Sequence, residues 1–121
     1  MTEVRVWAFG ESILVHEQRG LAMVTVVTDV RVKGGREAEW DEVFTKRVQA
    51  ASGQEGFVFV QLCRPEAARG ERVIVGTWQT HDDWKSWHED PAFVETREEL
   101  EEIEEESGQS RWYEVIVEER R

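Results

Sequence analysis

Residues 76–93 read GTWQTHDDWKSWHEDPAF and hold three of the six tryptophans in the chain. Tryptophan is large and costly to leave in water, so this density indicates an apolar surface that the fold uses. The β-branched run at 73–78 predicts a strand, and Thr80 predicts the N-cap of a helix that carries Trp84 and Trp87. We expect part of the wall of a binding pocket to come from this stretch.

Each of these tryptophans has a plain structural interpretation beside a functional one. Trp78 ends the predicted strand and is most simply part of the core, whereas Trp84 is either core or a contact between subunits. For Trp87, pocket wall and plain core are equally well supported. The stretch therefore locates a candidate pocket without identifying its ligand.

Around this stretch the chain alternates between strand-like and helix-like patterns. Runs rich in Val, Thr and aromatic residues predict strands, and apolar positions three and four residues apart predict helices. The predicted elements are a strand at 23–32, a helix at 36–51, strands at 57–63 and 71–78, a two-part helix that restarts at Pro91 and stops at Ser107, and a strand at 112–117. This β-α-β-β-α-β order is ferredoxin-like and belongs to the α+β class.

Residues 1–22 precede this pattern and are predicted to form an N-terminal hairpin extension. Two short apolar runs, at 4–9 and 12–16, are split by Gly10 and Glu11. We expect the hairpin to cover a sheet edge or to reach a partner subunit. Residues 23–121 are predicted to form one domain.

The predicted helices cover one face of the sheet, so the other face needs a cover. A small chain with an apolar second sheet face commonly supplies that cover by dimerising, and we predict a homodimer packed sheet to sheet. The acidic run at 97–106, REELEEIEEE, falls on the second helix, where Leu100 and Ile103 give it an apolar seam. A solvated helix face is therefore a better interpretation of this run than a cation site.

The composition narrows the range of partners. The chain has 26 Asp and Glu against 15 Lys and Arg, a formal charge of −11, which argues against nucleic acid and against anionic membrane surfaces. A single cysteine, Cys63, excludes an intrachain disulfide and lies in an apolar run that predicts a buried thiol. The N-terminal residues have the pattern of neither a signal peptide nor a membrane span, so we expect a cytoplasmic protein.

The pattern as a whole resembles the antibiotic biosynthesis monooxygenase family of dimeric α+β barrels. The resemblance rests on VKGG at the end of the first strand, the helix EAEWDEVFTKRV, a strand that starts at Gly56-Phe57 and ends at QLCRP, and W-x(5)-W-x-x-W-x(3)-PAF across residues 78–93. It covers residues 23–118. It implies a pocket in each subunit, between the helices and the concave side of the sheet.

The resemblance implies two kinds of oxygen chemistry. Haem-degrading members use an asparagine on the first strand, a tryptophan in the second helix and an axial histidine about nine or ten residues later. Here Trp87 supplies the tryptophan, but Thr28 stands at the asparagine position and Thr96 or Arg97 at the histidine position. Haem binding is therefore the less favoured alternative, and we expect no cofactor.

The favoured interpretation is a cofactor-independent monooxygenase of a small aromatic or phenolic substrate, in which the substrate itself supplies the electrons. Such a protein needs an apolar pocket, a base and a hydrogen bond to the substrate oxygen. The expected catalytic residues are Trp87, His88 and Arg97, and the expected substrate-binding residues are Thr28, Trp84, Phe93 and Thr96.

Simpler interpretations stay open at this point. Arg97 is also placed to pair with Glu101 one helical turn on, and His88 is also interpretable as a surface histidine. His81 and His88 are two helical turns apart, too far to chelate one ion, so no metal site is predicted. A non-catalytic ligand-binding barrel is the alternative function. In that case Trp87 and its neighbours should pack shut, whereas an oxygenase should show polar groups around an open cavity.

Overall fold

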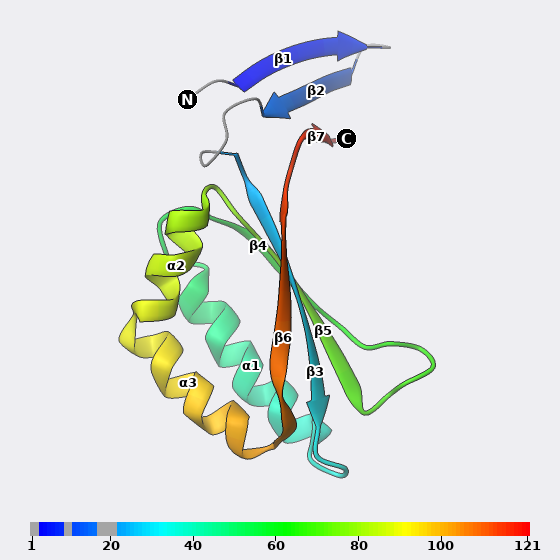
Figure 1. Cartoon of the computed structure of the whole chain (residues 1–121), viewed down its shortest axis with the longest axis vertical. Helices are drawn as coiled ribbons and strands as arrows, with labels where there is room; N and C mark the ends of the chain where they lie inside the picture. Colours follow the sequence, from blue (N-terminus) through cyan, green and yellow to red (C-terminus); the bar gives the residue numbers. More distant parts are fainter. Residues whose placement is uncertain (1–2, 9–10, 17–21) are drawn as a thin grey trace.

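Four antiparallel strands form the main sheet of the computed structural model, and helices cover one of its faces (Figure 1). The structure describes residues 3–8, 11–16 and 22–121, with the backbone alone for the first two ranges and for Ser107. The strands are β3 (Val24–Val32), β4 (Phe57–Cys63), β5 (Glu71–Trp78) and β6 (Glu104–Glu114), and the helices are α1 (Glu37–Ala51), α2 (His81–Glu89) and α3 (Pro91–Glu102). The sheet order β4-β5-β3-β6 is that of a ferredoxin-like fold, which confirms the predicted α+β class.

A second, smaller sheet joins the two ends of the chain. Strands β1 (Glu3–Ala8) and β2 (Glu11–His16) pair antiparallel, as the predicted hairpin requires, and β2 pairs with β7 (Val117–Glu119). The connection at residues 9–10 lies outside the described residues. The hairpin thus extends the C-terminal strand of its own chain and not an edge of the main sheet. Contact with a partner subunit and a domain division at residue 22 stay predictions.

The last helix ends earlier than the sequence predicts. α3 stops at Glu102 and β6 begins at Glu104, whereas the pattern predicted a helix to residue 107 and a strand from residue 112. Glu104 lies opposite Val32 of β3, so long-range strand pairing overrides the local helical seam. The acidic run is therefore divided between a helix and a strand and is not one helix face.

The two helices that follow β5 begin as predicted. The Thr80 hydroxyl accepts a hydrogen bond from the Asp83 amide at 3.0 Å and caps α2. The Asp90 carboxylate accepts one from the Ala92 amide at 2.9 Å, and Pro91 occupies the first turn of α3, where its missing N–H costs nothing. These caps fix the residues at which the two helices begin.

Gly56 allows the start of β4 to approach the start of α2. Its φ of 82° favours glycine, and a Cβ there would lie 2.2 Å from Asp83 Oδ2. Its carbonyl accepts a hydrogen bond from the Gln79 amide at 2.7 Å. The end of β5 and the first turn of α2 are thereby fixed against β4.

The side chains between the helices and the sheet form two apolar clusters. The buried residues of the first cluster are Val30, Val32, Trp40, Val43, Phe44, Leu100 and Ile103. Those of the second are Val24, Val26, Ala51, Trp78, Trp87 and Phe93. The two clusters divide the space under the helices instead of filling it as one core.

The other face of the main sheet is open in the single chain. Phe59 and Tyr113 expose 42% and 50% of their surface. Cys63 is also exposed, so its predicted burial is wrong. The cause is a register shift between Phe57 and Phe59, which reverses the alternation along β4 and turns Phe59 and Cys63 away from the helices.

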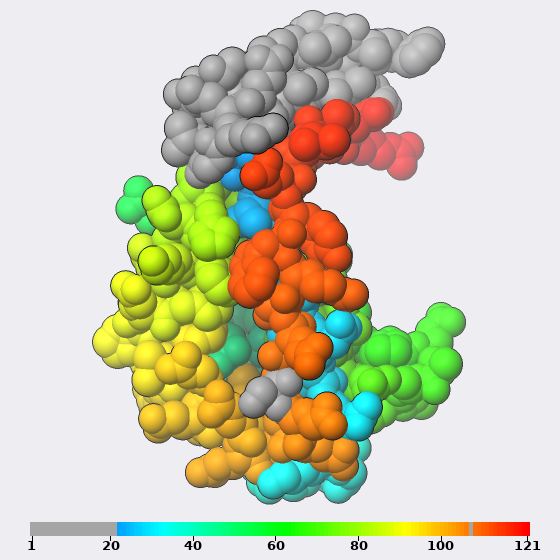
Figure 2. All heavy atoms as spheres, viewed as in Figure 1, coloured from blue at the N-terminus to red at the C-terminus, as the bar shows by residue number. Residues whose placement is uncertain are grey.

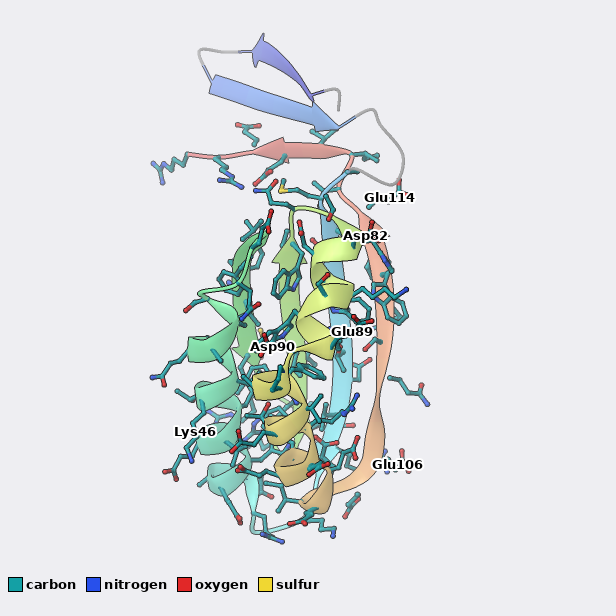
Figure 3. The ribbon with its side chains drawn as sticks, turned by 90° about the vertical axis from the view of Figure 1, so that its left-hand side faces the viewer. Lys46, Asp82, Glu89, Asp90, Glu106 and Glu114 are labelled. Atoms are coloured by element: carbon teal, nitrogen blue, oxygen red, sulfur yellow. The ribbon has the colours of Figure 1, made fainter. Side chains whose placement is uncertain are left out.

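Charged side chains cover the outer sides of the helices. Lys46 projects from α1, and Glu89 and Asp90 lie at the junction of α2 and α3 (Figure 3). This charged cover matches the net charge of −11. In the described part of the chain, each helix is too short or too polar to cross a membrane.

Candidate functional site

A cavity of about 350 Å³ lies between the helices and the covered face of the main sheet. Its lining includes Phe44 and Leu100 from the first cluster and Val26 and Trp78 from the second, so the cavity separates the two clusters. Figure 2 shows the surface hollowed between α3 and β6, with atoms of α1 visible in the hollow. Its volume is within the range of small-molecule pockets.

Aromatic rings form the wall of the cavity on the α2 side. Trp87 is buried, stacks on Trp78 with ring centroids 6.4 Å apart, and meets Phe93 edge to face at 5.6 Å. Trp84 meets Trp112 of β6 edge to face at 5.3 Å. All five rings line the cavity, so Trp87 is at once core and pocket wall, and Trp84 packs within its own chain.

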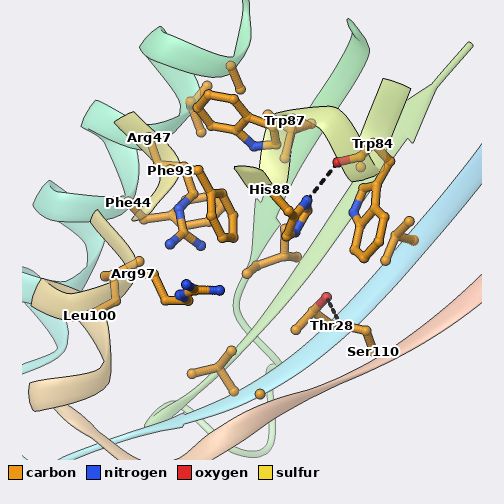
Figure 4. A pocket seen from close by; sticks show the side chains of 18 of the residues that line it. Thr28, Phe44, Arg47, Trp84, Trp87, His88, Phe93, Arg97, Leu100 and Ser110 are labelled. Atoms are coloured by element: carbon orange, nitrogen blue, oxygen red, sulfur yellow. Dashed lines mark hydrogen bonds between the residues drawn. The ribbon is translucent and has the colours of Figure 1, made fainter. Parts of the chain in front are cut away.

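His88 is held between two of these rings. Its imidazole centroid lies 3.9 Å from that of Trp84 and 4.0 Å from that of Phe93. Nδ1 lies 2.8 Å from the Trp84 carbonyl oxygen, which can only accept, so Nδ1 carries the proton and Nε2 keeps its lone pair (Figure 4). Burial lowers the pKa of His88 to about 4, the Trp84 hydrogen bond opposes this, and the charge of Arg47 adds to the lowering. At neutral pH the ring is a neutral base that lines the cavity.

Arg47 places a guanidinium on the ring of Phe93, with its Cζ 4.1 Å from the ring centroid. Its Nε donates to Thr96 Oγ1 at 3.0 Å, while its buried Nη2 has no acceptor among the described residues. A buried donor without a partner costs about 1–3 kcal/mol. Burial lowers the pKa of Arg47 to about 10, partly opposed by the charge of Glu104, so the group remains a cation at neutral pH.

Arg97 is the second cation of the cavity. Its Cζ lies 5.6 Å from the Phe93 centroid, and Figure 4 shows its guanidinium near that of Arg47. Within the described residues it forms no ion pair, so the alternative pairing with Glu101 is not made in this structure. Two like charges therefore share one wall of the cavity.

The two threonines among the predicted residues occupy different places. Thr28 lines the cavity from β3, where its hydroxyl is hydrogen-bonded to that of Ser110 at 2.8 Å. Thr96 is buried outside the lining: its hydroxyl donates to the Phe93 carbonyl at 3.0 Å and accepts from Arg47 Nε. The structure thus places Thr96 behind Arg47, where it orients the guanidinium.

Glu104 adds a carboxyl group at the base of the cavity. It accepts a hydrogen bond from Trp40 Nε1 at 2.8 Å. Burial raises the pKa of this carboxyl, although the Trp40 hydrogen bond and the charge of Arg47 oppose the rise. The cavity therefore holds an acid and a base in separate environments.

Sequence reasoning missed the cavity residues that other elements supply, namely Arg47, Glu104, Ser110 and Trp112. For Arg47 a signal was available, because it lies four residues after Val43 and three after Phe44, within the apolar stripe of α1. A cation inside such a stripe is expected to face a pocket or a buried acid. Glu104, Ser110 and Trp112 depended on the early start of β6, which local pattern did not indicate.

The fold and the site together define a small α+β domain with an aromatic pocket that holds a neutral imidazole and two guanidinium groups. Residues 23–99 match the model of the antibiotic biosynthesis monooxygenase family, and the chain belongs to that family. Comparison with curated protein sequences gives no match.

Solved structures show the same fold at low sequence identity. SnoaB of Streptomyces nogalater, described as a cofactor-independent oxygenase, is 23% identical with a TM-score of 0.71, over 78% of this chain and 93% of its own. A Nitrosomonas europaea protein named for the same family is 13% identical with a TM-score of 0.76, over 83% and 95% of the two chains. A conserved protein of Methanosarcina mazei is 14% identical with a TM-score of 0.74, over 78% and 94%.

The residues present do not fit the haem-degrading pattern. Thr28, which the resemblance places at the asparagine position, has its hydroxyl engaged by Ser110. Thr96 and Arg97, between which the resemblance places the histidine, offer no imidazole to iron. In the ranges that the structure describes, no group of three or more His, Cys, Asp or Glu side chains could hold a metal ion.

Proposed function

We propose that the chain is a monooxygenase that oxidises a small aromatic or phenolic substrate in this cavity without a cofactor. The observation that carries the proposal is the convergence of a neutral imidazole and two guanidinium groups on an open, aromatic cavity. A family member that kept the fold and lost the activity would be expected to fill this space with apolar side chains. The family match and the cofactor-independent oxygenase SnoaB among the similar structures support the same proposal.

His88 is the proposed base. Its Nε2 lone pair takes a proton from the substrate, and Nδ1 stays fixed on the Trp84 carbonyl, which holds the ring in orientation. The developing anion is stabilised by the positive charges of Arg47 and Arg97 at the cavity wall. Thr28 and Ser110 offer hydroxyl groups to a substrate oxygen from the sheet side.

Dioxygen is the oxidant in this scheme. The deprotonated substrate gives one electron to O₂, the two radicals combine to form a peroxide on the substrate carbon, and loss of water leaves a carbonyl. For a methylene group between two aromatic rings the balance is R₂CH₂ + O₂ → R₂C=O + H₂O. The substrate supplies all the electrons, so the protein has to supply only the base, the charge and the walls.

Oxygen uptake with anthrone as substrate tests this function. Replacing His88 with Gln should lower kcat by about 10²–10⁴-fold, the usual contribution of a positioned base. His81→Gln is the matched control, because His81 is the exposed histidine of the same helix. An oxygen electrode and the anthraquinone absorbance would report turnover together. Binding of anthrone without oxygen uptake would instead identify a ligand-binding barrel.

The same proposal includes a homodimer that packs through the open face of the main sheet. Phe59 and Tyr113 lie exposed on that face beside half-buried Val27, Val73 and Val75. Apolar groups on a sheet face are stabilised when a second copy covers them. Light scattering at several protein concentrations would report the oligomeric state.

A further inference from the structure

Arg47 presents a guanidinium nitrogen that the described protein leaves without an acceptor. The group cannot turn away, because Thr96 takes its Nε and the ring of Phe93 lies against its plane. In Figure 4 the guanidinium groups of Arg47 and Arg97 lie close together beside Phe93. This part of the cavity wall therefore holds a hydrogen-bond donor in a fixed position, to which a ligand can supply the acceptor.

The charges around this site favour an anion with a single charge. Arg47 and Arg97 repel each other, and neither makes an ion pair within the described residues. The acids that also line the cavity are Glu101 and Glu104, and Glu104 is engaged by Trp40. Because these acids offset part of the positive charge of the two arginines, the lining balances one negative charge better than two, which favours a carboxylate over a dianion such as a phosphate ester.

We propose that the ligand of this pocket is a flat aromatic carboxylic acid. Its carboxylate accepts hydrogen bonds from Arg47 Nη2 and from Arg97, in the planar geometry that suits guanidinium and carboxylate. Its rings lie against Trp84, Trp87 and Trp112. The inference rests on the proposed function and adds the class of substrate, an acid that carries the ring to be oxidised.

A matched pair of probes tests the carboxylate. Calorimetric titration of the full chain at low salt would compare 2-naphthoate with 2-naphthalenemethanol, which has similar rings and no charge. We expect the acid to bind at least about 10-fold more tightly, the effect of one charge-assisted contact. Equal affinities for acid and alcohol, or no binding of either probe, would overturn the inference.

Variants test whether the preference for the acid over the alcohol comes from the two arginines. Arg47→Gln should reduce the acid-to-alcohol ratio to about 1, Arg47→Lys should keep part of it, and Glu104→Gln should raise it by removing a repelling charge. Lys46→Gln is the control, because Lys46 is the exposed neighbour on α1 and lies outside the cavity lining. An equal loss in Lys46→Gln would contradict a local site. If Arg47→Gln failed to fold, Arg97→Gln on the exposed side would carry the test.

Oxygen uptake separates this inference from the proposed function. Selective binding of naphthoate without oxygen uptake on either anthrone or an anthrone carboxylic acid would contradict the oxygenase and leave the acid site. Turnover of anthrone without any preference for the acid would contradict the acid site alone and leave the proposed oxygenase.

Discussion

The two faces of the main sheet are built from the same strands but carry different side chains. The covered face carries two apolar clusters, an aromatic cavity and the buried part of Arg47. The open face carries half-buried valines such as Val27 and Val75, and the exposed ion pair Arg111–Asp29 at 3.0 Å. By our proposals, alternate residues of one strand thus serve chemistry on one side and assembly on the other.

The two faces should differ most in how much a truncated side chain lowers the free energy of unfolding. Leu100 is 2% exposed on the covered face, and Leu100→Ala should lower the free energy of unfolding by about 3 kcal/mol, within the range of about 2–5 kcal/mol for such cavities. Urea denaturation would measure the loss. Val75→Ala is the comparison on the open face: at protein concentrations low enough to keep the chain monomeric we expect less than half that cost, because Val75 is then only half-buried. Similar costs would contradict the division into core face and assembly face.

A charge on the open face should separate the subunits without unfolding them. Val75→Asp would bury a carboxylate between the sheets, and we expect the dimer dissociation constant to rise by at least about 100-fold, about 2.7 kcal/mol. Sedimentation would report the mass, and circular dichroism should show the secondary structure unchanged. Ser86→Asp, an equal charge change at an exposed position on α2, should leave the mass as it is. A wild-type chain that stays monomeric at about 100 μM, where a dimer with a Kd of about 1 μM would be mostly formed, would contradict the proposed dimer.

The half-buried His88, which packs over the covered face, should affect the pH dependence of the free energy of unfolding. Folded His88 has a pKa near 4, below its value of 6.5 in the unfolded chain, so the unfolded state takes up a proton first as the pH falls. Stability should therefore drop between about pH 6.5 and pH 4, by about 2 kcal/mol once partial exposure is discounted.

Comparison with His88→Gln isolates this contribution. Glu104 acts in the opposite direction, because its raised pKa favours the folded state as the pH falls, and it is present in both proteins. The difference in unfolding free energy between wild type and variant, measured from pH 7.5 to pH 4, should shift in favour of the variant toward low pH. A difference that does not change with pH would show that His88 is solvated.

The sequence predicted what depends on local pattern. The cap at Thr80, the helix start at Pro91, the apolar stripe of α1 and the order of the elements along the chain all follow from spacing and residue type. It did not predict what depends on distant pairing. The start of β6 is set by its register with β3, so the part of the site that comes from Glu104, Ser110 and Trp112 was not foreseen. The exposure of Cys63 depends on a bulge in β4, which has no local signal in residues 57–59.

Loss of the exposed ion pair on the open face should have the smallest effect on the free energy of unfolding. The size of that effect distinguishes a covered face from a free one. Arg111 and Asp29 expose 58% and 55% of their side chains, so in a single chain Arg111→Ala should cost about 0–1 kcal/mol and less at high salt. If a second copy covers this face, the pair is desolvated and its loss leaves Asp29 without a partner. The cost should then exceed about 2 kcal/mol, resist salt and grow with protein concentration. Arg36→Ala at the exposed Arg36–Glu39 pair supplies the baseline, because that pair lies at the start of α1, in the helix layer, in either case. Equal, salt-sensitive losses in the two variants would show that the open face meets only water.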